Sequence, residues 1–236
     1  AGLRIKGQQR LARFEALVNS GRPISPGAFA VNKITPEMLQ AAPDISKIMP
    51  KFLDFIRGSC LCSYNAEFDM GFLNNELRLL GQPQVMGLVV LDILTMAKKL
   101  IPGLPRYALW FVAKHLGIES TQAHRAFSDV EITWEVFAKL KNISRQKGIT
   151  GFNNFISLFA YNPPERASFS QESAALIQKC IQAKGILTMR YISTQNGEIS
   201  QRQVIPQEIR QDNKYKYLVA YCCLKKEQRI FRMDNI

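Results

Sequence analysis

The sequence predicts an α/β layer domain followed by a smaller β domain. Up to about residue 140, short apolar runs of strand length alternate with segments whose apolar residues recur at helical spacing, and this alternation is typical of α/β layer domains. From residue 185 onward, strand-like runs are separated by turns, among them the hairpin signal Asn196-Gly197. Short strands joined by turns predict a small β-barrel or sandwich. A chain of 236 residues is long enough for both domains.

The composition indicates a globular protein with a basic surface. Apolar residues make up 47% of the chain, and 31 Lys and Arg residues against 19 Asp and Glu residues give a net charge of +12. Both halves are basic, so a polyanion such as nucleic acid is a reasonable partner, although charge alone does not identify it.

Cysteines and apolar runs bear on the cellular setting. The five cysteines form no CxxC pair, so they indicate neither a disulfide framework nor a zinc site, and we expect a reducing, cytoplasmic setting. No apolar run is long enough to span a membrane and no signal peptide opens the chain, so we expect no membrane partner.

The first 57 residues predict a hairpin and two helices. Residues 3–18 alternate around turn signals at Gly7 and at Gln8 with Gln9, which indicates a β-hairpin followed by a longer strand. Thr35 and Pro36 have the pattern of an N-cap and a first helical position. Residues 45–57 place their apolar side chains on one helical face, so we expect a helix that buries that face.

Residues 59–73 contain the first candidate for a functional side chain. The apolar run at residues 61–64 predicts a buried strand, and the amphipathic pattern after Asn65 predicts a helix. Asp69 then lies in the first helical turn, where unpaired backbone N–H groups and the helix dipole favour an anion. On these residues alone, Asp69 is either a helix cap or a metal-binding carboxylate.

The next segments carry three more polar candidates. Residues 88–94 form an apolar run that predicts a strand covered on both faces, and Asp92 within it is interpreted as a cap of the next helix in preference to a site neighbour. After a helix at residues 107–116, another begins near Phe127 or Ser128 and runs to about residue 141. His124 and Asp129 can face one site only if His124 lies in the preceding loop, because five residues span about 140° of a continuous helix.

Two motifs, SYNAEFD at residues 63–69 and AHRAFSD at residues 123–129, resemble those of the DEDDh family of 3′–5′ exonucleases. The epsilon proofreading subunit of bacterial DNA polymerase III typifies this family, which has a ribonuclease H-like fold. Supporting matches cover roughly residues 10–140, namely LVNSGRPIS, ITPEML, LDILTMAKKLIPGLPRYAL and LGI. The order and spacing of these short matches make the set specific.

The resemblance implies a bacterial nuclease that uses two divalent ions, Mg²⁺ or Mn²⁺, to stabilise both the attacking and the leaving oxygen of a phosphodiester. Asp69 and Asp129 would be metal ligands, and His124 would take a proton from the attacking water, which suits its unperturbed pKa of about 6.5. Asn65 and Phe68 would contact the substrate. The expected substrate is single-stranded DNA or the 3′ ends of DNA, with RNA as an alternative, and polymerase or repair proteins are candidate partners.

The sequence departs from the family pattern in two places. Tyr64 stands where family members often carry histidine, which removes no metal ligand. The first motif, an aspartate and a glutamate one residue apart on the opening strand, is absent, since Glu15 is the first acidic residue. We therefore expect the 236 residues to be a fragment of a nuclease that is nearly inactive alone, because two carboxylates neutralise two divalent ions poorly.

The C-terminal residues resemble a WYL domain, an Sm/SH3-like barrel of bacterial regulators. The matching runs are ILTMRYIS, VIPQEIR, KYKYLVAYC and FRMD, with Lys216 in place of the name-giving tryptophan. In the family a basic, aromatic groove binds nucleic acid or another ligand, and Arg190, Tyr217 and Arg232 occupy the matching positions. The alternative is that Tyr217 belongs to the core and the arginines are solvated.

The expected division is an exonuclease domain at residues 1–160, a linker at 161–171, and a WYL-like domain at 172–236 that begins with a helix at Glu172 and continues beyond Ile236. The fold class is then α/β, a ribonuclease H-like domain without its first strand, followed by the barrel. The rival functional hypothesis is a non-catalytic nucleic-acid-binding regulator that keeps the nuclease fold as a scaffold. Three polar groups that converge on one point, Asp69, His124 and Asp129, argue against a scaffold.

Overall fold

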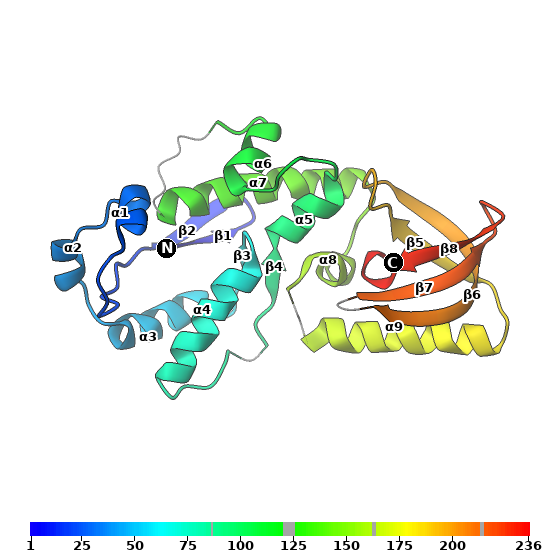
Figure 1. Cartoon of the computed structure of the whole chain (residues 1–236), viewed down its shortest axis with the longest axis horizontal. Coiled ribbons are helices and arrows are strands. Elements are labelled where there is room, and N and C mark those ends of the chain that lie inside the picture. The colour runs from blue at the N-terminus through cyan, green and yellow to red at the C-terminus, as the bar shows by residue number, and fades with distance from the viewer. Residues whose placement is uncertain (86, 120–125, 162–163, 213–214) are drawn as a thin grey trace. The chain divides into compact units, whose positions relative to one another are not determined.

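The computed structural model describes residues 1–85, 87–119, 126–161, 164–212 and 215–236, with the backbone alone for 164–171, and Figure 1 gives the element labels. Contacts divide the chain into two compact units. One comprises residues 1–89 and 108–139, and the other comprises residues 90–107 and 140–236. These units differ from the expected domains in their limits, so the domain boundaries at residues 160 and 172 stay a prediction.

The first unit opens with the expected hairpin. Strands β1 (Gly2–Lys6) and β2 (Gln9–Phe14) pair antiparallel across a turn in which Gly7 takes a φ of +66°, a left-handed conformation that favours glycine. Phe14 then packs against two rings of the helix that covers the hairpin, with centroids 5.5 Å from Phe52 and 5.3 Å from Phe55. These ring contacts anchor the hairpin.

Three capped helices follow the hairpin. Helices α1 (Pro26–Asn32), α2 (Pro36–Gln40) and α3 (Ile45–Ile56) are each preceded by a side chain that accepts a hydrogen bond from a first-turn amide, namely Ser25, Thr35 and Asp44. The predicted cap at Thr35 is confirmed, and so is the helix expected at residues 45–57. Helix α3 buries Met49 and Ile56 on its inner face, as its spacing predicts.

Strand β3 (Leu61–Ser63) and helix α4 (Ala66–Leu79) form the strand–helix junction predicted around Asn65. The Leu61 amide donates a hydrogen bond to the Val89 carbonyl at 2.9 Å. Helix α6 (Leu109–His115) buries Val112 and Ala113. Helix α7 (Ala126–Gln146) starts next to the predicted position and continues five residues beyond the predicted end.

The second unit contains a small α/β layer made from distant segments. Strand β4 (Val90–Asp92) leads directly into helix α5 (Ile93–Leu100), so the predicted strand at residues 88–94 is shorter than expected because Asp92 already caps the helix. Helix α8 (Phe152–Phe159) ends where the Tyr161 amide donates to the Val90 carbonyl at 2.7 Å. Fully buried side chains of α5 and α8 fill the core here, including Ile93, Met96 and Phe159.

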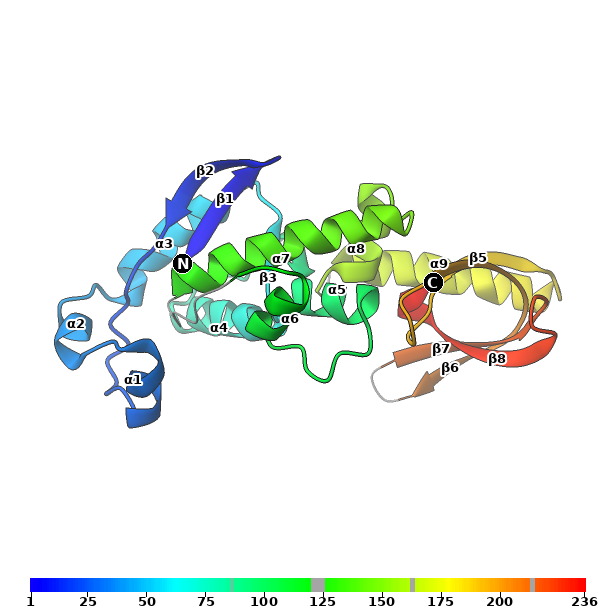
Figure 2. The ribbon, with the colours of Figure 1, turned by 90° about the horizontal axis from the view of Figure 1, so that it is seen from above.

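Four antiparallel strands make up the rest of the second unit. Strands β5 (Leu187–Ile192), β6 (Ile199–Asp212), β7 (Tyr215–Cys222) and β8 (Glu227–Arg232) are hydrogen-bonded in the order β5-β6-β7-β8, and a 3₁₀ turn, η1 (Met233–Asn235), follows. Figure 2 shows that the sheet curls strongly. Its concave side packs on a cluster of apolar side chains that includes Ile177 from helix α9 (Pro164–Gln182), Met189, Val204, Leu218 and Phe231.

The four-stranded sheet differs from the expected β-barrel because, in the part of the chain that the structure describes, it is not closed. Among the described strands no ladder of hydrogen bonds joins β5 to β8, so the sheet is curled and open. Its two edges meet through side chains: the Tyr191 and Phe231 ring centroids lie 5.1 Å apart, and the Asn235 amide donates to the Ile192 carbonyl at 3.2 Å. Four strands span too small an arc for a closed ladder, since even the five-stranded small barrels are partly open.

Helix α9 begins earlier than the sequence predicts. It starts at Pro164, within the expected linker at residues 161–171, and not at Glu172. Proline is well suited to the first helical position because it lacks the N–H group that would be unpaired there. The two adjacent prolines in the sequence, at positions 163 and 164, are therefore compatible with a helix start as well as with a linker.

No helix in the described part of the chain has the length and apolarity needed to cross a membrane.

Candidate functional site

Asp69 lies in the first turn of α4, as predicted. Asn65, just before the helix, adopts a left-handed conformation with φ +68° and makes no side-chain cap, a conformation that asparagine tolerates better than most residues. The turn at Asn65 brings the end of β3 back over α4, and the Ser63 hydroxyl donates a hydrogen bond to the Asp69 carboxylate. Ser63 therefore orients Asp69, a contact that the sequence alone did not indicate.

An exposed aromatic pair lies beside Asp69. Phe68 and Phe72 are 61% and 60% exposed, and their ring centroids lie 4.9 Å apart on one face of α4. Phe68 is a predicted substrate contact, whereas Phe72 is not among the residues predicted from the sequence. Phe72 could have been identified from its spacing, because residues four positions apart on a helix share a face.

Asp129 lies in the first turn of α7 and is exposed. Two contacts from β2 hold this end of the helix: the Arg13 guanidinium lies 3.5 Å from the centroid of the Phe127 ring, and Arg10 pairs with Glu131 at 2.8 Å. Neither arginine was singled out from the sequence, because β2 and α7 are more than 100 residues apart.

Interactions of the hairpin segment involve the first turns of both α4 and α7. Burial lowers the pKa of the Ala1 amino group, and the carboxylates of Glu15 and Asp69 oppose that shift, so both lie within Coulombic reach of the start of β1. Glu15 pairs in turn with Arg13, which stacks on Phe127 near Asp129. Asp69 thus interacts electrostatically with the start of β1, and Asp129 lies in the helix turn that Arg13 of β2 contacts, whereas His124 lies outside the described residues.

The donor set suits a hard divalent ion in its chemistry. Asp69 and Asp129 supply exposed carboxylate oxygens, the ligands that Mg²⁺ and Mn²⁺ prefer. The number of ligands is small, however. Among the described residues, no group of three or more His, Cys, Asp and Glu side chains is placed to hold a metal ion. Two carboxylates supply fewer oxygen ligands than a pair of such ions needs.

The second candidate site lies on the curled sheet. Tyr217 on β7 and Arg232 on β8 are directly opposite in register, so the structure brings these two predicted residues together. The Arg232 guanidinium donates two hydrogen bonds to the Asp234 carboxylate, at 2.9 and 2.5 Å, and lies 4.0 Å from the centroid of the Tyr215 ring. Hydrogen bonding to Asp234 raises the pKa of Arg232 above its ordinary value. Tyr215 was missed, although it alternates with Tyr217 on one strand face.

Arg190 has a different environment from Tyr217 and Arg232. Arg190 lies opposite Gln201 of β6, whereas Tyr217 lies opposite Arg210 of the same strand. These two positions on β6 are nine residues apart. The Arg190 guanidinium donates to the Gly148 carbonyl, just after α7, at 2.8 Å. Arg190 therefore links β5 to the α7–α8 connection.

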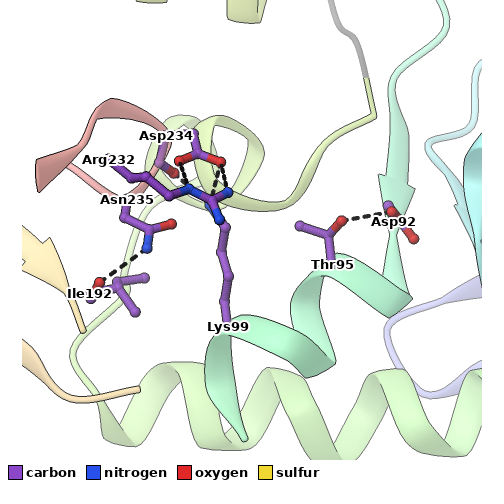
Figure 3. Close-up of polar contacts among 7 residues, drawn as sticks. All are labelled: Asp92, Thr95, Lys99, Ile192, Arg232, Asp234 and Asn235. Atoms are coloured by element: carbon purple, nitrogen blue, oxygen red, sulfur yellow. Dashed lines mark hydrogen bonds and ion pairs between the residues drawn. The ribbon is translucent and has the colours of Figure 1, made fainter. Parts of the chain in front are cut away.

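Asp92 acts as the predicted cap. Its carboxylate accepts hydrogen bonds from the Leu94 amide at 3.1 Å and from the Thr95 hydroxyl at 2.7 Å, the second of which is drawn in Figure 3. The preference for a cap over a site neighbour is consistent with these contacts, because both carboxylate oxygens are used at the helix start.

Comparisons with known proteins agree with the two-part organisation. The family model described as Exonuclease matches residues 1–137, and the model described as WYL domain matches residues 172–236. Among curated relatives, DNA polymerase III PolC-type of Bacillus subtilis (strain 168) is 35% identical over 149 residues, which are 63% of this chain and 10% of the relative. The PolC-type polymerase of Bacillus cereus is 33% identical over 148 residues, again 63% of this chain and 10% of the relative.

One solved structure, "Exonuclease X in complex with 5' overhanging duplex DNA", aligns with a TM-score of 0.46 and 26% identity, over 63% of this chain and 82% of that chain. The chain spans about a tenth of the length of the curated relatives it matches. The exonuclease match nevertheless extends over more than half of the 236 residues. The chain therefore belongs to the exonuclease family, with its ribonuclease H-like α/β fold, and carries a WYL domain at residues 172–236.

Proposed function

We propose that the protein is a 3′–5′ exonuclease that hydrolyses phosphodiester bonds of DNA. The observation that carries the proposal is that Asp69 and Asp129 each lie in the first turn of a helix in a chain of the exonuclease family. DNA is the proposed substrate because the curated relatives are DNA polymerases.

The roles of the residues follow from their chemistry. Asp69, oriented by the Ser63 hydroxyl, and Asp129 would hold Mg²⁺ or Mn²⁺ together with further oxygen ligands. A bound pair of such ions supplies Lewis-acid stabilisation of the attacking and leaving oxygens. His124 accepts the proton of the attacking water, and a neutral imidazole near pH 7 suits that task. Asn65 and Phe68 contact the terminal nucleotide, Phe68 through its exposed ring.

A polypeptide limited to residues 1–236 should show little of this activity. Asp69 and Asp129 supply two negative charges, and a pair of divalent ions carries four positive charges. We propose that such a polypeptide binds nucleic acid through its basic surface and hydrolyses it slowly. Robust Mg²⁺-dependent digestion by residues 1–236 alone would contradict this part of the proposal.

The WYL domain is proposed to bind nucleic acid or another phosphate-bearing ligand. Arg232 offers a planar guanidinium beside the rings of Tyr215 and Tyr217. Aromatic stacking with arginine pairing holds single strands with little sequence preference. Lys216 replaces the tryptophan of the family name, so the two tyrosines would supply the stacking surface.

The experiment compares 3′-labelled and 5′-labelled single-stranded DNA as substrates for the protein at the full length of its gene, with Mg²⁺ or Mn²⁺. We expect metal-dependent shortening from the 3′ end, abolished by His124→Ala and by Asp129→Ala. His115→Ala is the matched control, because His115 is the only other histidine and is exposed on α6. Its rate should equal that of the unsubstituted protein.

A second candidate is a non-catalytic nucleic-acid-binding regulator. It is favoured by the small acidic donor set among the described residues. The same experiment separates the two candidates, because binding without cleavage, unchanged by either substitution, would assign the function to the scaffold and the WYL domain.

A further inference from the structure

A buried lysine of the exonuclease-family region contacts the end of the WYL domain. Lys99, in the last turn of α5, is only 8% exposed, and its ammonium donates to the Asp234 carbonyl at 2.5 Å and lies 3.8 Å from the Asp234 carboxylate (Figure 3). A charged group this deeply buried needs a carboxylate or carbonyl nearby, because burial removes its hydration. Residues 99 and 234 both lie in the second compact unit.

Asp234 is shared between Lys99 and Arg232. Its carboxylate, 19% exposed, accepts both hydrogen bonds of the Arg232 guanidinium while it faces Lys99 (Figure 3). Arg232 lies over the Tyr215 ring on the face that we propose binds phosphate-bearing ligands. Contacts therefore run without interruption from that face, through Asp234, to α5.

The end of α5 is also fixed against the sheet by its backbone. Gly197, in the β5–β6 turn, lies so close to α5 that a Cβ there would be 2.8 Å from the Lys99 carbonyl oxygen and 2.9 Å from that of Leu100. Lys147 also donates to the Gly197 carbonyl, at 2.7 Å. The end of α5 and the β5–β6 turn are therefore tightly packed against each other.

We propose that Asp234 couples ligand binding on the WYL sheet to helix α5. A phosphate of single-stranded DNA that pairs with Arg232 competes with the Asp234 carboxylate, since both anions take the same two guanidinium donors. The released carboxylate then pairs more closely with Lys99 and tightens the junction of α5 with the sheet. The inference rests on the proposed role of Arg232 in ligand binding.

The coupling predicts the direction of two substitutions. Without the Lys99 charge, the Asp234 carboxylate loses one of its cationic neighbours and competes more strongly for Arg232. Lys99→Met should therefore weaken the binding of single-stranded DNA about fivefold, a typical coupling between two sites. Asp234→Asn removes the competing charge and should tighten binding. In the Asp234→Asn background, Lys99→Met should have little further effect.

The experiment measures the dissociation constant of a 12-residue oligodeoxythymidylate for residues 1–236 at fixed salt, by fluorescence anisotropy. Lys98→Met is the matched control: Lys98 is the neighbouring, exposed lysine of α5, and its substitution removes the same charge. We expect less than a twofold change for it. Lys99→Arg, which keeps the charge, should bind like the unsubstituted protein. Thymidine monophosphate and pyrophosphate, tested in parallel, distinguish a DNA strand from a free phosphate as the ligand.

Hydrogen exchange provides a second readout. The oligonucleotide should slow exchange of the amides of residues 97–101 in the unsubstituted protein and in Lys98→Met, and leave it unchanged in Lys99→Met. Binding that depends on Arg232 but is equal in Lys99→Met and Lys98→Met would overturn the coupling alone. Absence of binding by all three probes, or binding unaffected by Arg232→Met, would overturn the proposed ligand role as well.

Discussion

Gly197 occupies a position that no side chain fits. Its φ of +66° is left-handed, and a Cβ would lie 2.8 Å from a backbone oxygen of Lys99. We expect Gly197→Ala to lower the free energy of unfolding by about 3 kcal/mol, through backbone strain plus displacement of the α5 end. Urea unfolding of residues 1–236, followed by circular dichroism, measures the change.

Gly103 provides the control for this substitution. It belongs to the same compact unit, its φ is +88°, and nothing lies within 4 Å of an added Cβ. Gly103→Ala should therefore cost only the strain of a left-handed alanine, about 1 kcal/mol. Equal losses for the two substitutions would mean that the contact between the β5–β6 turn and α5 contributes nothing.

Asp44 predicts a pH effect. Hydrogen bonds from Ser46, including one from its amide at 2.8 Å, hold the pKa of the Asp44 carboxyl below its ordinary value. A lowered folded-state pKa stabilises the protein above the ordinary pKa of about 4, and the contribution is lost as the pH falls through the folded-state value. Between pH 6 and pH 3, Asp44→Asn should lose less stability than the unsubstituted protein, because asparagine caps without titrating. Identical losses in urea titrations would contradict this assignment.

Helix α8 has one face in the core and one in water. Phe159 is fully buried at its end, where the adjoining residues Ala160 and Tyr161 pair with β4. Phe159→Ala should therefore lower the free energy of unfolding by about 3–5 kcal/mol, through lost burial and an incompletely filled cavity.

Phe152, on the same helix, provides the comparison because it is 64% exposed. Phe152→Ala should change stability by less than about 0.5 kcal/mol, as surface substitutions usually do. Thermal and urea unfolding of both variants test this difference. If Phe159→Ala were as mild as Phe152→Ala, α8 would not be part of the core of the second unit.

For the molecule as a whole, the net charge of +12 predicts salt-sensitive binding of nucleic acid. Each phosphate neutralised on a single strand contributes about −0.7 to the slope of log K against log salt. With about four phosphates contacted, affinity should fall about 50-fold between 50 and 200 mM salt. Anisotropy titrations across this range measure the slope, and a slope near zero would show that the charge has no part in binding.

Many local features were predictable because their causes are local. The turn at Gly7, the cap at Thr35 and the cap at Asp92 depend on residues at most three positions away. The same reasoning placed Asp69 in the first turn of α4. The start of α9 at Pro164 differs from the predicted linker, because proline occurs both in linkers and at first helical positions.

Periodic patterns and short motifs in the sequence were thus enough to predict the α/β class, the four C-terminal strands and the helix starts that carry Asp69 and Asp129, since each rests on spacing within a few residues. The pairing of Lys99 with Asp234, across 135 residues, and of Arg190 with Gly148, across 42, required the folded chain. So did the open edge between β5 and β8. No periodicity links residues this far apart, and their contacts arise only when packing of the core brings the segments together.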